Sequence, residues 1–100
     1  MPEIPETVVL VTEALSGAAV ERWGRLLSDA VALRPGILVV DLRDCPHLDA
    51  AALTVLLAAH RSTVAAGGRL VLRAPGDRVR RTLHLARVGQ VFEVDAGVPA

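Results

Sequence analysis

The chain has 100 residues, which is enough for one domain and too short for two. Its apolar content of 52% and charged content of 22% are typical of a globular core and exclude a disordered chain. The net charge is zero and only 2% of the residues are Phe, Trp or Tyr, so the composition favours no nucleic-acid partner.

The N-terminal part of the chain is predicted to form a strand, a helix and a second strand. The apolar run Val8 to Val11 predicts the first strand, and Ser16 is expected to cap the helix. One apolar stripe recurs along this helix at helical spacing: Val20, Trp23, Leu27 and Val31. Pro35-Gly36 ends the helix, and the continuous apolar run Ile37 to Val40 is typical of a strand buried on both faces.

A second helix and a third strand follow. Asp49 is expected to cap this helix, and Gly67-Gly68 to close it. The side chains predicted on its inner side are Leu53, Leu56, Leu57, His60 and Val64. Arg69 to Arg73 alternates charged and apolar side chains as a strand does, which turns Leu70 and Leu72 to one face and Val71 to the other.

A third helix and a last strand complete the pattern. Pro75-Gly76-Asp77 is predicted to be a turn and helix cap, and Val79, Leu83 and Ala86 indicate a short amphipathic helix. Val91 to Val94 predicts the last strand. Because strands and helices alternate, we expect a small α/β sandwich with about four mostly parallel strands and three helices packed mainly on one face.

The sequence also indicates in which cellular compartment the protein is expected. The N-terminus lacks the basic and apolar segments of a signal peptide, and no apolar run is long enough to span a membrane. Cys45 is the only cysteine, so no internal disulfide can form, which fits a reducing compartment. We therefore expect a cytoplasmic protein that does not insert into a membrane.

Opposite charges are separated along the chain. Six arginines lie between residues 69 and 87 with Asp77 as the only acid among them, whereas four glutamates lie near the N-terminus. This pattern indicates either two solvated faces of opposite sign or a basic edge that meets an acidic partner. The group Arg78, Arg80 and Arg81 is likewise either a solvated helix face or a site for an anionic ligand.

The stretch Leu38 to Leu57, LVVDLRDCPHLDAAALTVLL, resembles the STAS family of anti-sigma-factor antagonists. In that family a strand ending in Asp-Leu leads to Asp-Ser-Ser-Gly-Leu at a helix start. Similar pieces are the strand entry beginning at Gly67-Gly68 and the closing strand Val91 to Val94. The resemblance covers about residues 8–94 and implies a single STAS-like domain over residues 1–100, in which Asp41 would fix the following loop.

The chain departs from the family pattern at three places. The Asp-Ser-Ser-Gly motif reads Asp49-Ala50-Ala51-Ala52, so Ala50 takes the position of the family's phosphoacceptor serine. The Gly-Glu-Leu-Asp turn reads Glu13-Ala14-Leu15-Ser16. Compared with the family, the first edge strand and the C-terminal helix are expected to be missing, which would leave a sheet edge or face for a second copy or a partner.

The resemblance implies a bacterial binding protein for transcription regulation, not an enzyme, with no cofactor. We expect an anti-sigma-factor antagonist-like protein that binds a kinase-like anti-sigma factor and is not regulated by phosphorylation. The residues expected to carry this contact are Pro46, His47, Leu48, Asp49, Ala50, Ala51, Ala52 and Leu53.

Several alternatives stay open. The loop before Asp49 has either kept its partner or no longer binds a kinase, and Thr54 is either a displaced phosphosite or an ordinary helix residue. One alternative function is the small STAS subunit of a lipid-transport ABC complex, which contacts an ATPase. Another is a sensor of nucleotides or other small ligands.

Other chemistry has weaker support in the sequence. Cys45 and His47 are close together, but a zinc site needs two further ligands nearby, so no metal is expected. Cys45 is either a loop residue without a role or a nucleophile, which would need a positioned base. Asp41, Asp44 and Asp49 would need a shared pocket to act as a general acid and base, and the sequence shows none.

Overall fold

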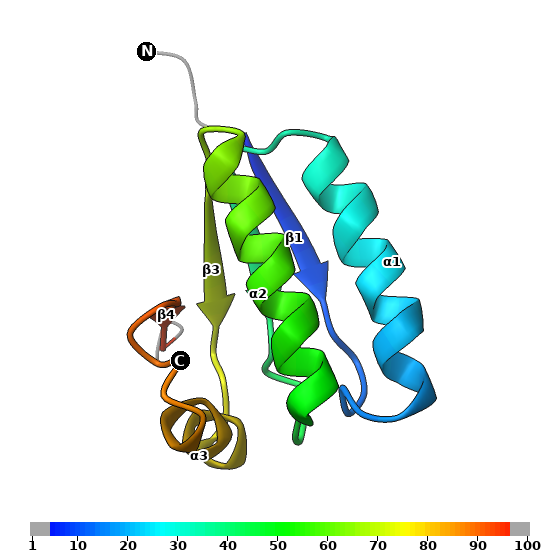
Figure 1. Cartoon of the computed structure of the whole chain (residues 1–100), viewed down its shortest axis with the longest axis vertical. Helices are drawn as coiled ribbons and strands as arrows, with labels where there is room; N and C mark the ends of the chain where they lie inside the picture. The colour runs from blue at the N-terminus through cyan, green and yellow to red at the C-terminus, as the bar shows by residue number, and fades with distance from the viewer. Residues whose placement is uncertain (1–4, 97–100) are drawn as a thin grey trace.

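The computed structural model describes residues 5–96. The helices and strands in chain order are β1 (Glu6–Leu10), α1 (Ala18–Ala32), β2 (Ile37–Asp41), α2 (Ala50–Ala65), β3 (Arg69–Arg73), α3 (Asp77–Leu85) and β4 (Glu93–Asp95). The four strands pair in the order β1-β2-β3-β4, and every pair is parallel (Figure 1). The predicted small α/β architecture is therefore confirmed.

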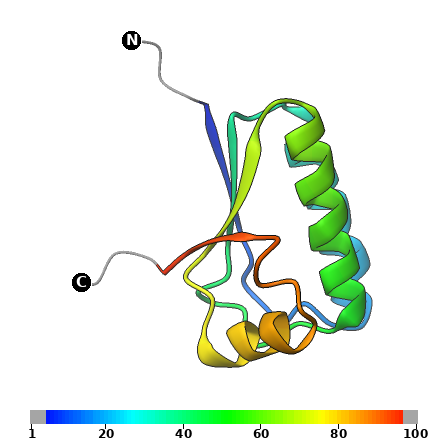
Figure 2. The same cartoon turned by 60° about the vertical axis from the view of Figure 1, so that its left-hand side comes forward.

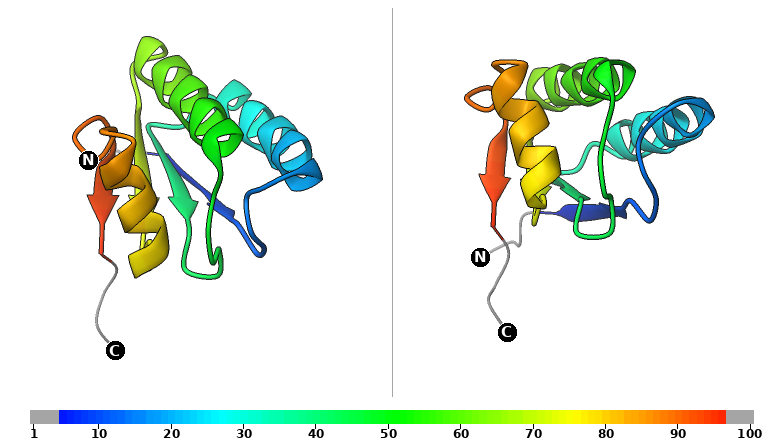
Figure 3. Two further views of the ribbon diagram at one scale, coloured as in Figure 1. Left: turned by 60° about the horizontal axis from the view of Figure 1, so that its bottom comes forward. Right: turned by 90° about the horizontal axis from the view of Figure 1, so that it is seen from below.

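The helices lie mainly on one side of the sheet. Figure 2 shows α1 and α2 side by side over the same face, while α3 lies across the end of the molecule where β2 and β3 finish. Seen from below in Figure 3, the opposite face of the sheet carries no helix among the described residues. Each of the first three strands is followed by a helix, after which the chain enters the next strand from the same end of the sheet, and this makes the pairing parallel.

The core lies between the sheet and the two long helices. Leu38 and Val40 from β2 and Leu70 and Leu72 from β3 are all buried on the helix side. The helix α1 contributes the larger side chains of its apolar stripe: Val20, Trp23 and Leu27. The predicted stripe of α1 is thus correct in outline, although Val31 is only partly buried.

The start of α1 differs from the prediction. Ser16 does not cap the helix; the capping position is Gly17, whose φ of 57° lies in the left-handed region that glycine tolerates, and no side chain of this turn caps it. The backbone N–H of Gly17 instead donates to the Asp49 carboxylate, 32 residues further along the chain. A partner so distant in the sequence could not be found from local helix-capping rules.

The side of α2 that faces the sheet overlaps the predicted side only in part. Its buried residues are Ala52, Leu53, Leu56, Ala59 and Thr63. Leu57 is partly buried against the core and His60 is partly buried against the Phe92 ring, whereas Val64 is 51% exposed, so Val64 is the predicted inner position that was wrong. The small Ala side chains allow a close approach to the sheet, and the Thr63 hydroxyl donates to the Ala59 carbonyl at 2.7 Å, which satisfies it in the core.

The C-terminal part also needs corrections. The predicted cap within Pro75-Gly76-Asp77 is confirmed, because Gly76 takes the capping position and α3 begins at Asp77, although no side-chain bond forms there. Val79 and Leu83 are buried as predicted, whereas Ala86 is exposed beyond the end of the helix. The last strand is Glu93–Asp95 instead of residues 91–94, because Phe92 turns into the core and is only 4% exposed.

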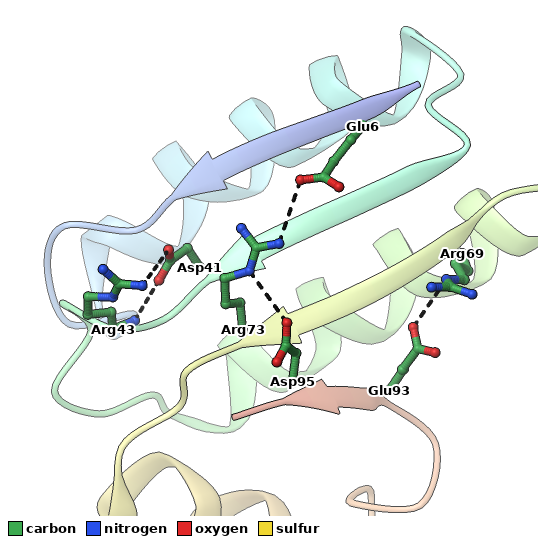
Figure 4. A network of polar contacts seen from close by, with 7 residues as sticks. All are labelled: Glu6, Asp41, Arg43, Arg69, Arg73, Glu93 and Asp95. Carbon is green, nitrogen blue, oxygen red and sulfur yellow. Dashed lines mark hydrogen bonds and ion pairs between the residues drawn. The ribbon is translucent and has the colours of Figure 1, made fainter. Parts of the chain in front are cut away.

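Charged side chains cover the centre of the helix-free face of the sheet (Figure 4), whereas Val8 and Leu10 on the edge strand β1 stay exposed. Arg73 on β3 lies between Glu6 on β1 and Asp95 on β4, with ion-pair distances of 3.6 and 3.7 Å. Beneath them Val39 is 1% exposed and Val71 is 7% exposed. The prediction that β2 is buried on both faces is therefore correct, but a helix covers only one of those faces.

Candidate functional site

The start of α2 is organised by one carboxylate. Asp49 Oδ1 accepts a hydrogen bond from the backbone N–H of Ala52 at 2.9 Å, which confirms the predicted cap. Asp49 Oδ2 accepts a second bond from the N–H of Gly17 at 3.1 Å. These bonds, from Ala52 first and Gly17 second, lower the pKa of Asp49 below its ordinary value.

Backbone contacts join the loops that precede α1 and α2. The N–H of Leu15 donates to the His47 carbonyl and the N–H of Asp49 donates to the Leu15 carbonyl, both at 3.0 Å. Leu15 and Leu48 form an isolated parallel bridge, and both side chains are buried. The Cys45 thiol also donates to the His47 carbonyl, at 3.3 Å. The two loops therefore form one continuous, rigid surface.

The eight residues predicted to bind a partner divide by exposure. Leu48, Ala52 and Leu53 are buried and support the surface from beneath. His47 and Asp49 are half-buried. We call the exposed members of the set, Pro46, Ala50 and Ala51, the α2-end surface. Its side chains are small and neutral, so they allow close approach of a protein surface without a charge to desolvate.

Ala50 is the first residue of α2 and is exposed. A helix start offers free backbone N–H groups and a partial positive charge, which can tolerate a phosphate. The methyl group of Ala50 cannot accept one. Thr54 is also exposed, and its hydroxyl donates to the Ala50 carbonyl at 3.3 Å, so the nearest hydroxyl on α2 is directed back along the helix.

A family model for the STAS domain matches residues 1–99. The chain belongs to the STAS domain family. The family predicted from the residues around Asp49 is thereby confirmed. A comparison with curated protein sequences found no matching relative of this STAS domain.

Solved structures of similar fold include anti-sigma factor antagonists. One from Mycobacterium paratuberculosis is 22% identical, with a TM-score of 0.84 over 98% of this chain and 83% of that chain. A proposed antagonist from Thermotoga maritima is 17% identical, with a TM-score of 0.85 over 93% of this chain and 80% of that chain. The anti-sigma factor antagonist SpoIIAA in its unphosphorylated form is 18% identical, with a TM-score of 0.71 over 99% of this chain and 86% of that chain. At these identities the likeness establishes the fold.

Other chemistry finds little support in the geometry of this STAS domain. Burial raises the pKa of the Cys45 thiol, which disfavours the reactive thiolate. Asp41 accepts the backbone N–H of Arg43 at 3.0 Å, the loop-fixing role that the resemblance implied. Within residues 5–96, no group of three or more His, Cys, Asp or Glu side chains is arranged to hold a metal ion.

A groove of about 400 Å³ lies between α1 and α2, away from the α2-end surface. Apolar side chains line most of it, including Val20, Leu27 and Val55. Val55 of α2 packs against Gly24 of α1 on the wall of this groove: a Cβ added at Gly24 would lie 3.5 and 3.6 Å from the two methyl carbons of Val55, an ordinary contact distance. Across the described part of the chain, none of the helices is long and apolar enough to cross a membrane.

No pattern in the sequence indicated that Gly17 and Leu15 belong to the same surface as Asp49. The turn from Glu13 to Ser16 was noted only as a departure from the family pattern. One usable signal is the glycine directly before the helix, because a positive φ there leaves a backbone N–H free for a distant acceptor.

Proposed function

We propose that this STAS domain binds a kinase-like anti-sigma factor through the α2-end surface and that phosphorylation at residue 50 does not regulate this binding. The single observation that supports the proposal is Ala50 itself. It is exposed at the first position of a helix whose start is fixed by Asp49, so the surface keeps its form without the hydroxyl. Such a protein would stay competent to bind its partner at all times.

The rigidity of the surface supports a docking role. Asp49 joins the turn at Gly17 to the start of α2, and Leu15 pairs with Leu48 beneath. A surface that is already ordered loses little conformational entropy when a partner binds. The domain would act by contact alone, with no catalytic step and no cofactor.

The test is a binding titration against the kinase-like anti-sigma factors of the same organism, in ADP and in ATP. The unchanged chain should bind equally in both, because residue 50 carries no phosphate. Ala50→Ser should bind in ADP, accept phosphate in ATP and then bind at least about tenfold more weakly, since the phosphate places nearly two negative charges at the contact. Ala50→Asp should be weakened in either nucleotide.

The matched control is Ala58→Asp, which places the same charge at an exposed position further along α2. It should leave the affinity unchanged. The proposal fails if no anti-sigma factor binds the chain, or if Ala50→Asp and Ala58→Asp weaken binding equally. Binding to a transporter ATPase instead of an anti-sigma factor would favour a lipid-transport subunit.

A further inference from the structure

The helix α3 and the turn after it carry four exposed arginines that form no ion pair with any residue in the range 5–96: Arg78, Arg80, Arg81 and Arg87. In contrast, five other arginines of the described chain each pair with a carboxylate: Arg22, Arg25, Arg43, Arg69 and Arg73. With Asp77 as the only acid, four arginines leave residues 77–87 with a formal charge of +3. Arg34 and Arg61, which lie singly elsewhere in the described chain, also form no ion pair there, so the feature that sets residues 77–87 apart is the clustering of unpaired arginines.

The position of these arginines is unfavourable for the helix itself. Arg78, Arg80 and Arg81 lie in the first five residues of α3, where the helix dipole disfavours cations. Arg78 and Arg81 are three residues apart and so repel each other on one side of the helix. Asp77 in the first turn offsets part of this charge, but the capping residue Gly76 provides no side-chain bond. No contact within the described chain accounts for the cluster, whereas an anionic partner would.

The basic helix lies at the same end of the molecule as the α2-end surface. Figures 1 and 3 show α3 and the start of α2 at the same end of the molecule, beyond the ends of β2 and β3. The loop that leads to α2 begins beside the end of β3, where the N–H of Leu42 donates to the carbonyl of Arg73, the last residue of that strand, at 2.8 Å. A partner on the neutral α2-end surface would therefore have α3 beside it.

We propose that α3 is a docking surface for an acidic segment of a protein partner, next to the α2-end surface. The identity of the occupant as a protein rests on the proposed function. Guanidinium groups form strong, paired hydrogen bonds with carboxylates, so Asp and Glu side chains are the groups that this cluster fits. The arginines would contribute both to the rate of association and to the choice of partner.

Two other anionic partners fit the structure less well. Single-stranded nucleic acid stacks its bases on aromatic side chains, but Trp23 and Phe92 are only 9% and 4% exposed. A membrane-surface helix needs an apolar face turned outward. The apolar side chains Val79 and Leu83 of α3 face the core, which leaves Leu85 as its exposed apolar residue.

The test is a titration of the isotope-labelled chain with a poly-glutamate peptide, followed by amide NMR shifts at low and physiological salt. The largest shifts should fall in residues 77–87. The double variant Arg78→Glu, Arg81→Glu should bind at least about tenfold more weakly, because two charge-assisted contacts are replaced by repulsion. The control Arg61→Glu changes an exposed arginine of α2 that also forms no ion pair, and it should leave binding unchanged.

Several results would overturn this inference: no shift in residues 77–87, equal weakening by Arg61→Glu, or tighter binding to single-stranded DNA or phosphatidylglycerol vesicles than to poly-glutamate. The same double variant should weaken binding to the anti-sigma factor. If the factor binds and the double variant has no effect, the inference alone fails. If poly-glutamate binds α3 but no anti-sigma factor binds the chain, the proposed function alone fails.

Discussion

Asp49 is the residue on which the geometry of the candidate site depends most. Its two oxygens accept bonds from the first turn of α2 and from Gly17 at the start of α1. Both bonds favour the charged carboxylate, which is why the pKa of Asp49 is lowered. The side chain thus links two helix starts that local sequence rules would treat as independent.

The stability that Asp49 provides should depend on pH with a definite sign. Because its folded-state pKa is lowered, the contribution is fully present at neutral pH, begins to decline near the unfolded-state value of about 3.9, and is lost as the pH falls through the folded-state pKa. We expect Asp49→Asn to be less stable than the unchanged chain at neutral pH. The difference between the two should shrink as the pH falls below about 4.

Urea unfolding at a series of pH values measures this difference directly. Asp29→Asn, at an exposed position on the outer side of α1, is the matched control and should show no comparable pH dependence relative to the unchanged chain. If the free-energy difference for Asp49→Asn stayed constant between neutral and strongly acidic pH, the two bonds to the carboxylate would not be stabilising the fold.

At the scale of the element, α1 and α2 show what sequence pattern can and cannot predict. Polar residues interrupt α1 regularly, so its stripe through Trp23 and Leu27 was visible in the sequence. In α2 most positions are apolar, so several stripes fit the pattern equally well. The side with Ala52 and Ala59 faces the sheet because its side-chain volumes fit there. That fit depends on residues from other elements, so the pattern within α2 cannot show it.

Two substitutions test which side of α2 faces the sheet. Leu56 is fully buried, so Leu56→Ala should lower the free energy of unfolding by about 2–5 kcal/mol through lost burial and a cavity. Val64 is 51% exposed, so Val64→Ala should change it by less than about 0.5 kcal/mol. Denaturant unfolding of both variants measures this. Equal losses would support the side predicted from the sequence and contradict the observed packing.

At the scale of the whole molecule, the alternation of strands and helices was sufficient to predict a parallel sheet with helices on one face. It did not predict how the other face is covered. Glu6, Arg73 and Asp95 lie on three different strands, and their ion pairs form only with the observed strand order and register. The strand residues themselves cover Val39 and Val71, while Val8 and Leu10 of the edge strand β1 are 48% and 45% exposed, so the expectation of an edge or face for a second copy or a partner stays a prediction.

The cover could come from the charge of Arg73 or from its aliphatic stem, and the free energies expected for the two show which contributes more. Its ion pairs, at 3.6 and 3.7 Å, are too long for hydrogen bonds, and exposed pairs of this kind contribute only about 0.2–1 kcal/mol. The aliphatic stem of an arginine can cover apolar surface by itself. We therefore expect Arg73→Ala to lower the free energy of unfolding by about 1 kcal/mol and Arg73→Met to lower it by less than half as much.

Denaturant unfolding at low and high salt measures the loss for both variants. The control is Arg25→Ala, which removes an exposed, ion-paired arginine of α1 and should have little effect. An equal loss for the Met and Ala variants that disappears at high salt would show instead that charge, not the stem, holds this face closed.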